Sequence, residues 1–183
     1  MTEHHTHTHN MSAPTEFVYC PRCATPMETR QVGDKPRRVC PACEYIYFTD
    51  PKVGVGVLVV SEGKVLLVRR VMNPERGKWS IPAGFVDRGE NPQETAVREA
   101  QEETGLDVVI DRLLDVYYNP PEAGGASIFI LYEAHIAGGT LRPGDDADRA
   151  EFFGADELPD LAFASTKDAI RRWQQTLTAD KDV

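Results

Sequence analysis

The sequence predicts an α/β fold in which a mixed sheet lies between two helices, preceded by a small cysteine-rich module. Runs of β-branched residues recur from residue 53 onward, and two segments carry apolar residues at helical spacing. All four cysteines lie ahead of the first β-branched run. Strands and helices that alternate in this way pack as layers around one core. The length of 183 residues suffices for one domain of ordinary size and a small appendage.

Composition and charge narrow the class of protein further. Hydrophobic residues make up 41% of the chain and charged residues 27%, which is typical of a globular protein. The formal net charge of -9 disfavours nucleic acid as a partner, because nucleic-acid-binding domains usually carry a basic patch. No apolar run approaches the roughly 20 residues of a membrane span. We therefore expect a cytoplasmic protein with no membrane partner.

The first 16 residues contain four of the five histidines and show no apolar periodicity. We expect this segment, residues 1–16, to be a disordered polar tail, because it has too few apolar residues to pack. Weak metal binding is the alternative that its histidines suggest, although His-rich tracts are only a compositional signal.

The cysteines form two C-x2-C pairs separated by sixteen residues: Cys20, Cys23, Cys40 and Cys43. This spacing is typical of a zinc ribbon, in which four thiolates close a tetrahedral site. The segment between the pairs suits a hairpin around Gly33, and the whole module covers residues 17–49. Structural zinc is favoured over disulfides because an intracellular protein keeps its thiols reduced. A single iron ion in the same four-sulfur site is a minor alternative.

Three extended segments open the larger domain, which we place at residues 50–178. Residues 53–60, VGVGVLVV, are long enough for a buried strand, and residues 64–71 return as its hairpin partner. Residues 79–86, WSIPAGFV, predict a short extended segment that Pro82 confines to an edge or a break.

A helix over residues 92–104 follows. Asn91 is a good N-cap, Pro92 suits the first helical position, and Glu94 completes a start that resembles a capping box. Gly105 predicts a left-handed C-cap.

Three glutamates of this helix, Glu99, Glu102 and Glu103, fall within an arc of about 100°. Val97 and Ala100 lie on the other side, so we expect one face to pack on a sheet and the other to present carboxylates. Clustered carboxylates are hard oxygen ligands suited to Mg²⁺ or Mn²⁺, which often take further ligands from substrate phosphates. A solvated glutamate face without a metal is the alternative.

The rest of the domain predicts more strands and a closing helix. Residues 107–118 indicate a bent strand, residues 127–136 a second strand, and residues 150–159 a short strand that leads into a turn. Residues 165–177 predict an amphipathic helix with Ser165 as its N-cap. Its apolar residues recur at helical spacing: Ala169, Ile170, Trp173 and Leu177.

The stretch GFVDRGENPQETAVREAQEETGL resembles the Nudix box, G-x5-E-x7-R-E-U-x-E-E-x-G-U, where U is apolar. Every defined position is filled: Gly84, Glu90, Arg98, Glu99, Ala100, Glu102, Glu103, Gly105 and Leu106. The likeness covers about residues 52–173 and implies a Nudix-type α/β/α sandwich. It also implies a metal-dependent hydrolase of nucleoside diphosphates linked to another moiety.

The resemblance implies a role for each matching residue. Glu99, Glu102 and Glu103 would bind Mg²⁺ or Mn²⁺, and one of them would help to deprotonate water. The carbonyl of Gly84 would contact the metal, Arg98 would orient the glutamates, and Glu90 would support Arg98. In related enzymes an acidic residue of a late loop binds metal or acts as base, and Asp146 stands in the matching loop. A solvated turn is the alternative for Asp146.

A zinc ribbon directly ahead of a Nudix domain resembles the FAD, ADP-ribose and NADH pyrophosphatases. The motif S-Q-P-W-P-F-P-x-S of the NADH enzymes is absent, and the LAFAS segment resembles the FAD and ADP-ribose type. A non-catalytic nucleotide-sensing regulator is the alternative to an enzyme, and the complete box disfavours it. Arg37 and Arg38 suggest a third hypothesis, in which the ribbon binds nucleic acid. The acidic charge of the rest of the chain disfavours it.

We expect a small nucleotide as substrate. The ribbon could equally serve in packing or dimerisation, so a homodimer is a further hypothesis. No substrate-binding residue follows from the sequence. We expect specificity to come from three loops, residues 72–78, 119–125 and 141–148.

Overall fold

The protein is described by a computed structural model that covers residues 17–120 and 126–179. Its chain forms two compact units, Met1–Asp50 and Pro51–Val183, which we describe separately. The expected disordered tail, residues 1–16, lies outside the described residues. No helix among those described is long and apolar enough to cross a membrane.

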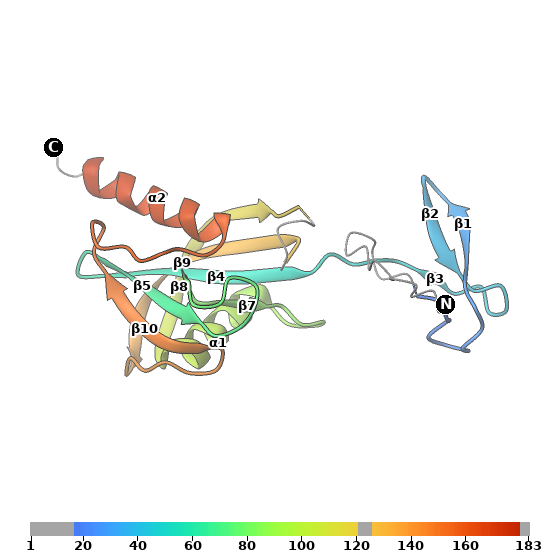
Figure 1. Cartoon of the computed structure of the whole chain (residues 1–183), viewed down its shortest axis with the longest axis horizontal. Coiled ribbons are helices and arrows are strands. Elements are labelled where there is room, and N and C mark those ends of the chain that lie inside the picture. The colour runs from blue at the N-terminus through green and yellow to red at the C-terminus, as the bar shows by residue number, and fades with distance from the viewer. Residues whose placement is uncertain (1–16, 121–125, 180–183) are drawn as a thin grey trace, which may run out of the picture. The chain divides into compact units, whose positions relative to one another are not determined.

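The first unit is a three-stranded antiparallel sheet in the order β1-β2-β3 (Figure 1). Strand β1 spans Glu28–Val32, β2 spans Lys35–Val39 and β3 spans Ile46–Tyr47. The β1–β2 hairpin turns at Gly33, as predicted, with Val32 paired to Lys35. Its small core consists of Cys20, Met27 and Cys40, with two half-buried tyrosines packed against them. So small a core supplies little stability by itself, because short segments bury too little apolar surface.

The second unit is built on a mixed sheet in the order β10-β5-β4-β9-β8. Strands β4 and β9 are parallel, and the other pairs along this order are antiparallel. The long strands are β4 (Val53–Ser61), β5 (Lys64–Arg70), β8 (Leu106–Tyr118), β9 (Ile128–Gly139) and β10 (Ala147–Phe153). Two short strands extend the sheet: β6 (Trp79–Ser80) pairs with β5, and β7 (Ala83–Phe85) pairs with β4. The predicted extended segment 79–86 is therefore real but is interrupted, as Pro82 implied.

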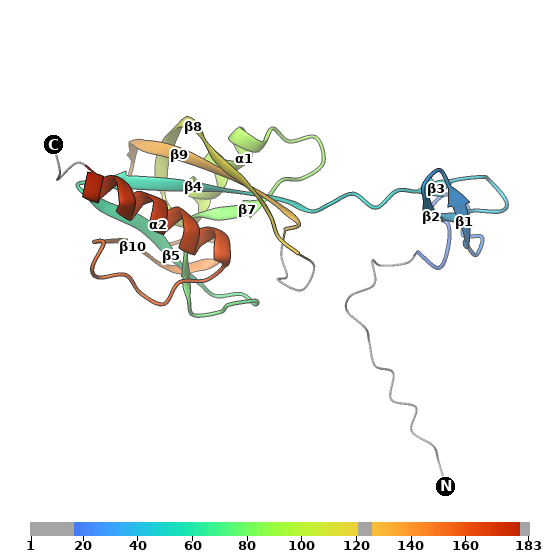
Figure 2. The same ribbon diagram turned by 90° about the horizontal axis from the view of Figure 1, so that it is seen from above.

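Two helices cover opposite faces of this sheet, α1 (Pro92–Thr104) and α2 (Ala164–Ala179) (Figures 1 and 2). The core on the α1 side contains Ala96 and Ala100 against the valines of β4. The core on the α2 side contains Ile170 and Trp173 against β5 and β9. The predicted sandwich with a mixed sheet between two helices is confirmed.

One local expectation was wrong, and the expected packing face of α1 was confirmed. Helix α2 begins at Ala164, so Ser165 lies inside its first turn and is not the N-cap. The expected face of α1 does pack on the sheet: Ala100 is fully buried and Val97 packs half-buried against the same core, with Ala96 fully buried beside them. Small side chains allow the helix to approach the sheet closely, and the face that packs is therefore centred on the alanines.

Candidate active site

Helix α1 forms where its capping residues predict. The Asn91 side chain accepts a hydrogen bond from the Gln93 N–H at 3.0 Å, and Pro92 occupies the first turn. At the other end Gly105 adopts a φ of 69°, and its N–H bonds to the Gln101 carbonyl at 2.8 Å. Only a residue that tolerates positive φ ends a helix in this way at little cost. The helix therefore fixes the relative positions of Glu99, Glu102 and Glu103.

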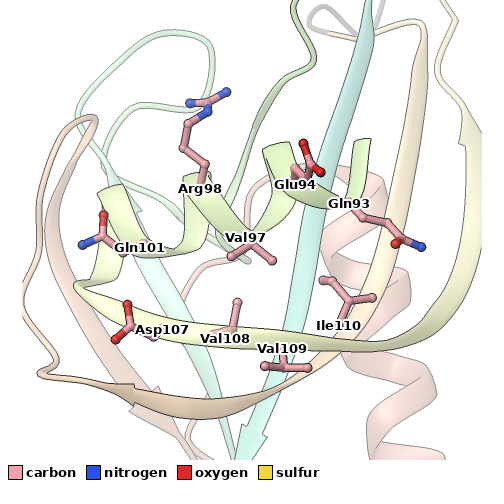
Figure 3. A pocket seen from close by; sticks show the side chains of 9 residues that line it. All are labelled: Gln93, Glu94, Val97, Arg98, Gln101, Asp107, Val108, Val109 and Ile110. Carbon is pink, nitrogen blue, oxygen red and sulfur yellow. The ribbon is translucent and has the colours of Figure 1, made fainter. Parts of the chain in front are cut away.

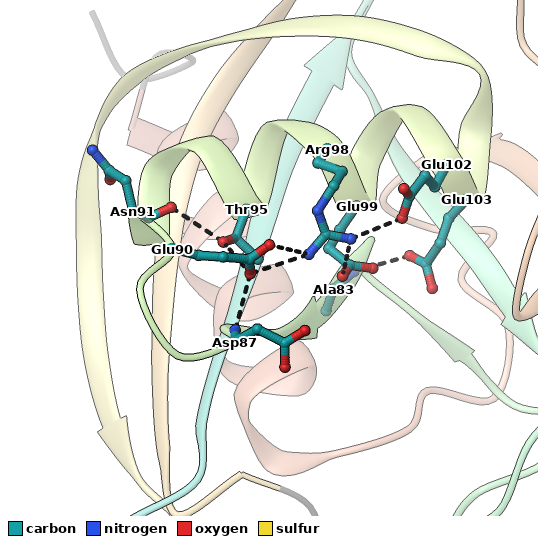
Figure 4. A network of polar contacts seen from close by, with 9 residues as sticks. All are labelled: Ala83, Asp87, Glu90, Asn91, Thr95, Arg98, Glu99, Glu102 and Glu103. Carbon is teal, nitrogen blue, oxygen red and sulfur yellow. Dashed lines mark hydrogen bonds and ion pairs between the residues drawn. The ribbon is translucent and has the colours of Figure 1, made fainter.

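Arg98 connects three carboxylates of this segment (Figure 4). One terminal nitrogen of its guanidinium lies 2.9 Å from a Glu99 oxygen and 2.9 Å from a Glu102 oxygen. Its other terminal nitrogen lies 3.4 Å from Glu90. This planar fork holds several carboxylates in one geometry, as a single ammonium could not. Arg98 thus contacts Glu99, Glu102 and Glu90 at once, while its orienting role stays a prediction.

Glu90 is held from two sides. Its carboxylate accepts the Asp87 backbone N–H at 2.9 Å and the Thr95 hydroxyl at 3.0 Å. These two hydrogen bonds, aided by the charge of Arg98, keep the pKa of Glu90 below its usual range. Glu90 is therefore a fixed anion that anchors the guanidinium.

Glu103 is buried, with 5% of its surface exposed. One oxygen accepts the backbone N–H of Ala83 at 2.9 Å. Burial raises the pKa of Glu103 to about 8, and the charges of Glu99 and Asp146 act in the same direction. The Ala83 N–H and the charge of Arg70 oppose the increase but do not cancel it.

The three glutamates therefore do not form the solvated face that was the alternative to a metal site. Glu102 is exposed, Glu99 is half-buried and Glu103 is enclosed. Burial also raises the pKa of Glu99, supported by the charges of Glu102 and Asp145 and opposed by Arg98. The helical period predicts only the direction in which each side chain points from the helix axis. Whether a carboxylate is covered depends on strand β7, which packs beside the helix.

Gly84 lies against Glu99. A Cβ atom at position 84 would collide with the Glu99 carboxylate. A glycine is therefore the residue that lets the backbone of β7 and this carboxylate approach each other.

The loop that carries Asp146 packs on the C-terminal end of α1. The Arg142 N–H bonds to the Thr104 carbonyl at 2.9 Å, and the Gly144 N–H bonds to the Glu103 carbonyl at 3.2 Å. The Asp146 carbonyl accepts the Val71 N–H at 3.0 Å, which ties the loop to the end of β5. Asp146 is exposed and its charge acts on Glu103. The structure thus brings Asp146 to the glutamates, while its role stays a prediction.

A cavity of about 280 Å³ adjoins this cluster at Gly84 and Asp146. Its four largest apolar side chains are Met72, Phe85, Phe129 and Phe163, and three smaller ones complete the apolar lining: Pro74, Ala83 and Ala126. Polar side chains line it as well: Arg70, Asn73, Asn119, Asp146 and Ser165. Apolar walls with a few placed polar groups are typical of small-molecule sites.

Each of the three loops expected to set specificity contributes to this cavity, through Met72, Asn119 and Asp146. Sequence reasoning missed Arg70, Phe129, Phe163 and Ser165, which come from strands and from the start of α2. One signal was present in VGVGV, because Gly54 and Gly56 alternate within a buried strand. The Phe129 ring fills the space beside both glycines, where a Cβ at Gly56 would lie 2.6 Å from its tip.

A wider depression of about 570 Å³ lies between α1 and β8 (Figure 3). Gln93, Val97 and Gln101 border it from the helix, and Val108 and Ile110 border it from the strand. Glu99, Glu102 and Glu103 line neither hollow, but their neighbours Ala83, Gly84 and Asp146 line only the smaller cavity. Ala83 donates to Glu103, and Gly84 lies against Glu99. The smaller cavity is therefore the candidate substrate site.

The comparison with known families agrees with this geometry. The NUDIX domain family matches residues 50–174. The chain belongs to the Nudix hydrolase family.

Individual Nudix relatives are also similar over much of the chain. An ADP-ribose pyrophosphatase of Methanocaldococcus jannaschii is 41% identical over 125 residues, which are 68% of this chain and 74% of the relative. The NAD-capped RNA hydrolase NudC of Chromobacterium violaceum is 32% identical over 78% of this chain. That match spans about half of the relative, 52% of its length. A Nudix hydrolase structure from Nitrosomonas europaea superposes with a TM-score of 0.79 at 35% identity, covering 87% of this chain and 91% of that one.

The donor chemistry of the Nudix box fits Mg²⁺ or Mn²⁺, since its ligands would be carboxylate and carbonyl oxygens. One cationic nitrogen of Arg98 already bridges Glu99 and Glu102, which marks a position where positive charge is stabilised. Within residues 17–120 and 126–179, however, the three glutamates do not bring their oxygens within 4.8 Å of one another. Glu103 is turned towards Ala83, so these side chains would reorient to share one cation.

The four cysteines do form a compact group, with all Sγ atoms within 4.8 Å of one another. Cys23 lies 3.4 Å from Cys40 and 3.6 Å from Cys43, and Cys20 lies 3.6 Å from Cys43. Four sulfurs placed 2.3 Å from one zinc ion are separated by about 3.8 Å in a tetrahedron, so the site fits zinc.

Two similar turns build the cysteine group. The Ala24 N–H bonds to the Cys20 carbonyl at 2.8 Å, and the Glu44 N–H bonds to the Cys40 carbonyl at 3.0 Å. Ala24 and Glu44 both have positive φ, of 56° and 58°. The equivalent turns aim each pair of thiols inward, as the paired spacing predicted.

Proposed function

We propose that this protein is a divalent-metal-dependent pyrophosphohydrolase that cleaves a nucleoside diphosphate linked to a second moiety, with ADP-ribose as the first candidate. The observation that carries the proposal is the cavity of about 280 Å³ lined by Gly84, Asp146 and Ala83, whose N–H bonds to the enclosed Glu103. Its apolar walls suit a flat base, and Gly84 and Asp146 in its lining place it beside the glutamate cluster. The similarity to an ADP-ribose pyrophosphatase supports the choice of substrate.

The reaction adds water across a P–O–P bridge. One bond forms between the water oxygen and a phosphorus, the bridging P–O bond breaks, and the water proton passes to a carboxylate. Mg²⁺ or Mn²⁺, held by Glu99, Glu102, Glu103 and the Gly84 carbonyl, would neutralise the phosphate oxygens and the leaving group. Both products are phosphate monoesters.

Three other residues hold this arrangement in our proposal. Arg98 keeps Glu99 and Glu102 in register, as its two contacts of 2.9 Å suggest. Glu90 fixes Arg98 from behind. Asp146 acts from the opposite loop, either as a further oxygen ligand or as the group that takes the proton.

In the first unit, Cys20, Cys23, Cys40 and Cys43 would hold structural zinc. Four protein ligands close a tetrahedral shell and leave no position for water or substrate. We therefore give this site a structural role and no catalytic one.

A substrate panel tests the function. NADH, FAD, ADP-ribose, Ap4A and oxidised nucleoside triphosphates are incubated at equal concentration with Mg²⁺, and nucleotide products are quantified by chromatography. We expect ADP-ribose to show the highest kcat/KM and EDTA to abolish turnover. Undiminished turnover in EDTA would contradict the metal dependence, and a stronger preference for another compound would replace ADP-ribose.

A further inference from the structure

One side of the substrate cavity is lined by hydrogen-bond donors that have no partner. Arg70 is the one cationic side chain among the described residues that line the cavity. Its Nε donates to the Pro74 carbonyl at 3.2 Å, and its guanidinium stacks 4.8 Å from the centre of the Phe163 ring. Its two terminal nitrogens make no hydrogen bond or ion pair to the residues that the structure describes. The fork is therefore held in place while its donors stay free.

Ser165 is the second unpartnered group. This residue is 6% exposed and lines the same cavity. Its hydroxyl has no hydrogen-bond partner within the described part of the chain. Among the described residues only the Trp173 Nε1 is fully enclosed without a partner, so the Ser165 Oγ keeps some accessible surface. A hydroxyl in this position is suited to a ligand in the cavity.

The start of helix α2 supplies further donors beside Ser165. The first helical hydrogen bond runs from the Lys167 N–H to the Phe163 carbonyl at 3.2 Å. The N–H groups of Ala164, Ser165 and Thr166 have no acceptor among the residues 17–120 and 126–179. Helix α2 has 16 residues, so its N-terminal end also carries the partial positive charge of the helix dipole.

Strand β6 brings these groups together. The Arg70 N–H bonds to the Lys78 carbonyl at 3.0 Å at one edge of β6. The Ala162 N–H bonds to the Trp79 carbonyl at 2.7 Å, two residues before α2 begins. The same short strand thus positions the end of β5 and the start of α2, although almost a hundred residues of sequence separate them.

We propose that Arg70, the Ser165 hydroxyl and the first turn of α2 form one anion-binding subsite that holds a phosphate of the substrate's diphosphate. These three groups supply hydrogen-bond donors and positive charge, which are the complement of a phosphate group. The subsite would also offset the repulsion between the neighbouring carboxylates and the negatively charged diphosphate. The inference rests on the proposed function, in which the substrate carries a diphosphate.

The test measures the binding of inorganic pyrophosphate to the full chain in EDTA by titration calorimetry, so that neither metal nor base recognition contributes. Arg70→Gln is expected to weaken binding about tenfold, because a hydrogen bond to a charged group contributes about 1.5–3 kcal/mol. Ser165→Ala is expected to weaken it about threefold to tenfold, as a hydroxyl donor contributes less. Arg69→Gln is the matched control, since Arg69 pairs with Asp148 at 2.6 Å and does not line the cavity.

Unchanged pyrophosphate affinity in both Arg70→Gln and Ser165→Ala would overturn the subsite. An equal loss in Arg69→Gln would also overturn it, because the effect would then be one of general charge. Steady-state kinetics with Mg²⁺ and ADP-ribose separate the two proposals. If the variants lose pyrophosphate affinity but the wild type hydrolyses no compound of the panel, the subsite stands and the proposed function fails. If hydrolysis proceeds with the same KM in all variants, the function stands and the subsite fails.

Discussion

The Glu103 carboxylate accepts the backbone N–H of Ala83 at 2.9 Å, across twenty residues of sequence. This hydrogen bond joins the box helix α1 to the segment that carries Gly84. It holds the enclosed carboxylate against Ala83, which lines the substrate cavity. A substitution of Glu103 that keeps this hydrogen bond therefore tests the role of the carboxylate in catalysis without disturbing the fold.

Glu103→Gln is expected to lower kcat by about a hundredfold or more, as loss of one charge-stabilising group commonly does. The glutamine carbonyl can still accept the Ala83 N–H, so the fold should be kept. Steady-state kinetics and circular dichroism measure the two effects. Glu94→Gln is the matched control, because Glu94 is an exposed glutamate of the same helix. Near-normal kcat in a folded Glu103→Gln protein would refute the metal-site proposal.

Asp146→Asn tests the late loop. The charge of Asp146 acts on Glu103, and the Asp146 side chain lines the cavity. We therefore expect the variant to lower kcat about tenfold or more and to raise the Mg²⁺ concentration that gives half-maximal rate. Asp148→Asn serves as the control, because Asp148 is paired with Arg69 and does not line the cavity. If Asp146→Asn alters neither rate nor metal dependence, the loop is a solvated turn.

Cys40→Ser tests the thiol cluster. Cys40 is fully buried in the core of the first unit, so its loss should abolish stoichiometric zinc and unfold that unit. Structural zinc contributes on the order of 10 kcal/mol to such modules. The Nudix unit has its own two cores and should still hydrolyse substrate.

Elemental analysis and kcat per folded molecule measure the two effects of Cys40→Ser. A wild-type protein that carries no zinc when purified under reducing conditions would contradict the ribbon. Complete loss of kcat in a folded, zinc-free Nudix unit would show that the ribbon contributes to the active site.

Asp168 predicts a pH dependence of stability. The Tyr117 hydroxyl donates to it at 2.9 Å and Arg172 donates at 2.8 Å, and these contacts lower its pKa. A carboxyl with a lowered folded-state pKa stabilises the fold above its unfolded pKa of about 3.9, and this stabilisation is lost as pH falls through the lower folded value. Asp168→Asn should thus lower Tm at pH 7 by roughly 3 °C, for a net contribution of about 1 kcal/mol.

Thermal unfolding of the wild type and Asp168→Asn at pH 7 and at pH 3 or below measures this effect. The difference in Tm should shrink at the acid end, where the wild-type carboxyl gains a proton. A difference that is the same at both pH values would mean that the ion pair contributes nothing and that only packing was changed.

The sequence by itself determined the features that depend on local spacing. Asn91, Pro92 and Gly105 set the bounds of α1, because capping depends on residues within one turn of the helix end. The paired cysteines predicted a four-thiol cluster, because each pair needs only its own tight turn. The alternation of apolar runs and helical segments predicted the layers of the sandwich.

Only the tertiary structure decided which groups are enclosed and which side chains meet. Glu102 and Glu103 are adjacent in sequence, yet one is exposed and the other is buried, because β7 covers only the second. Arg70 and Ser165 come together because β6 bonds to the chain beside both of them. Contacts of this kind depend on how distant segments pack, and the spacing of residues along one segment does not carry that information.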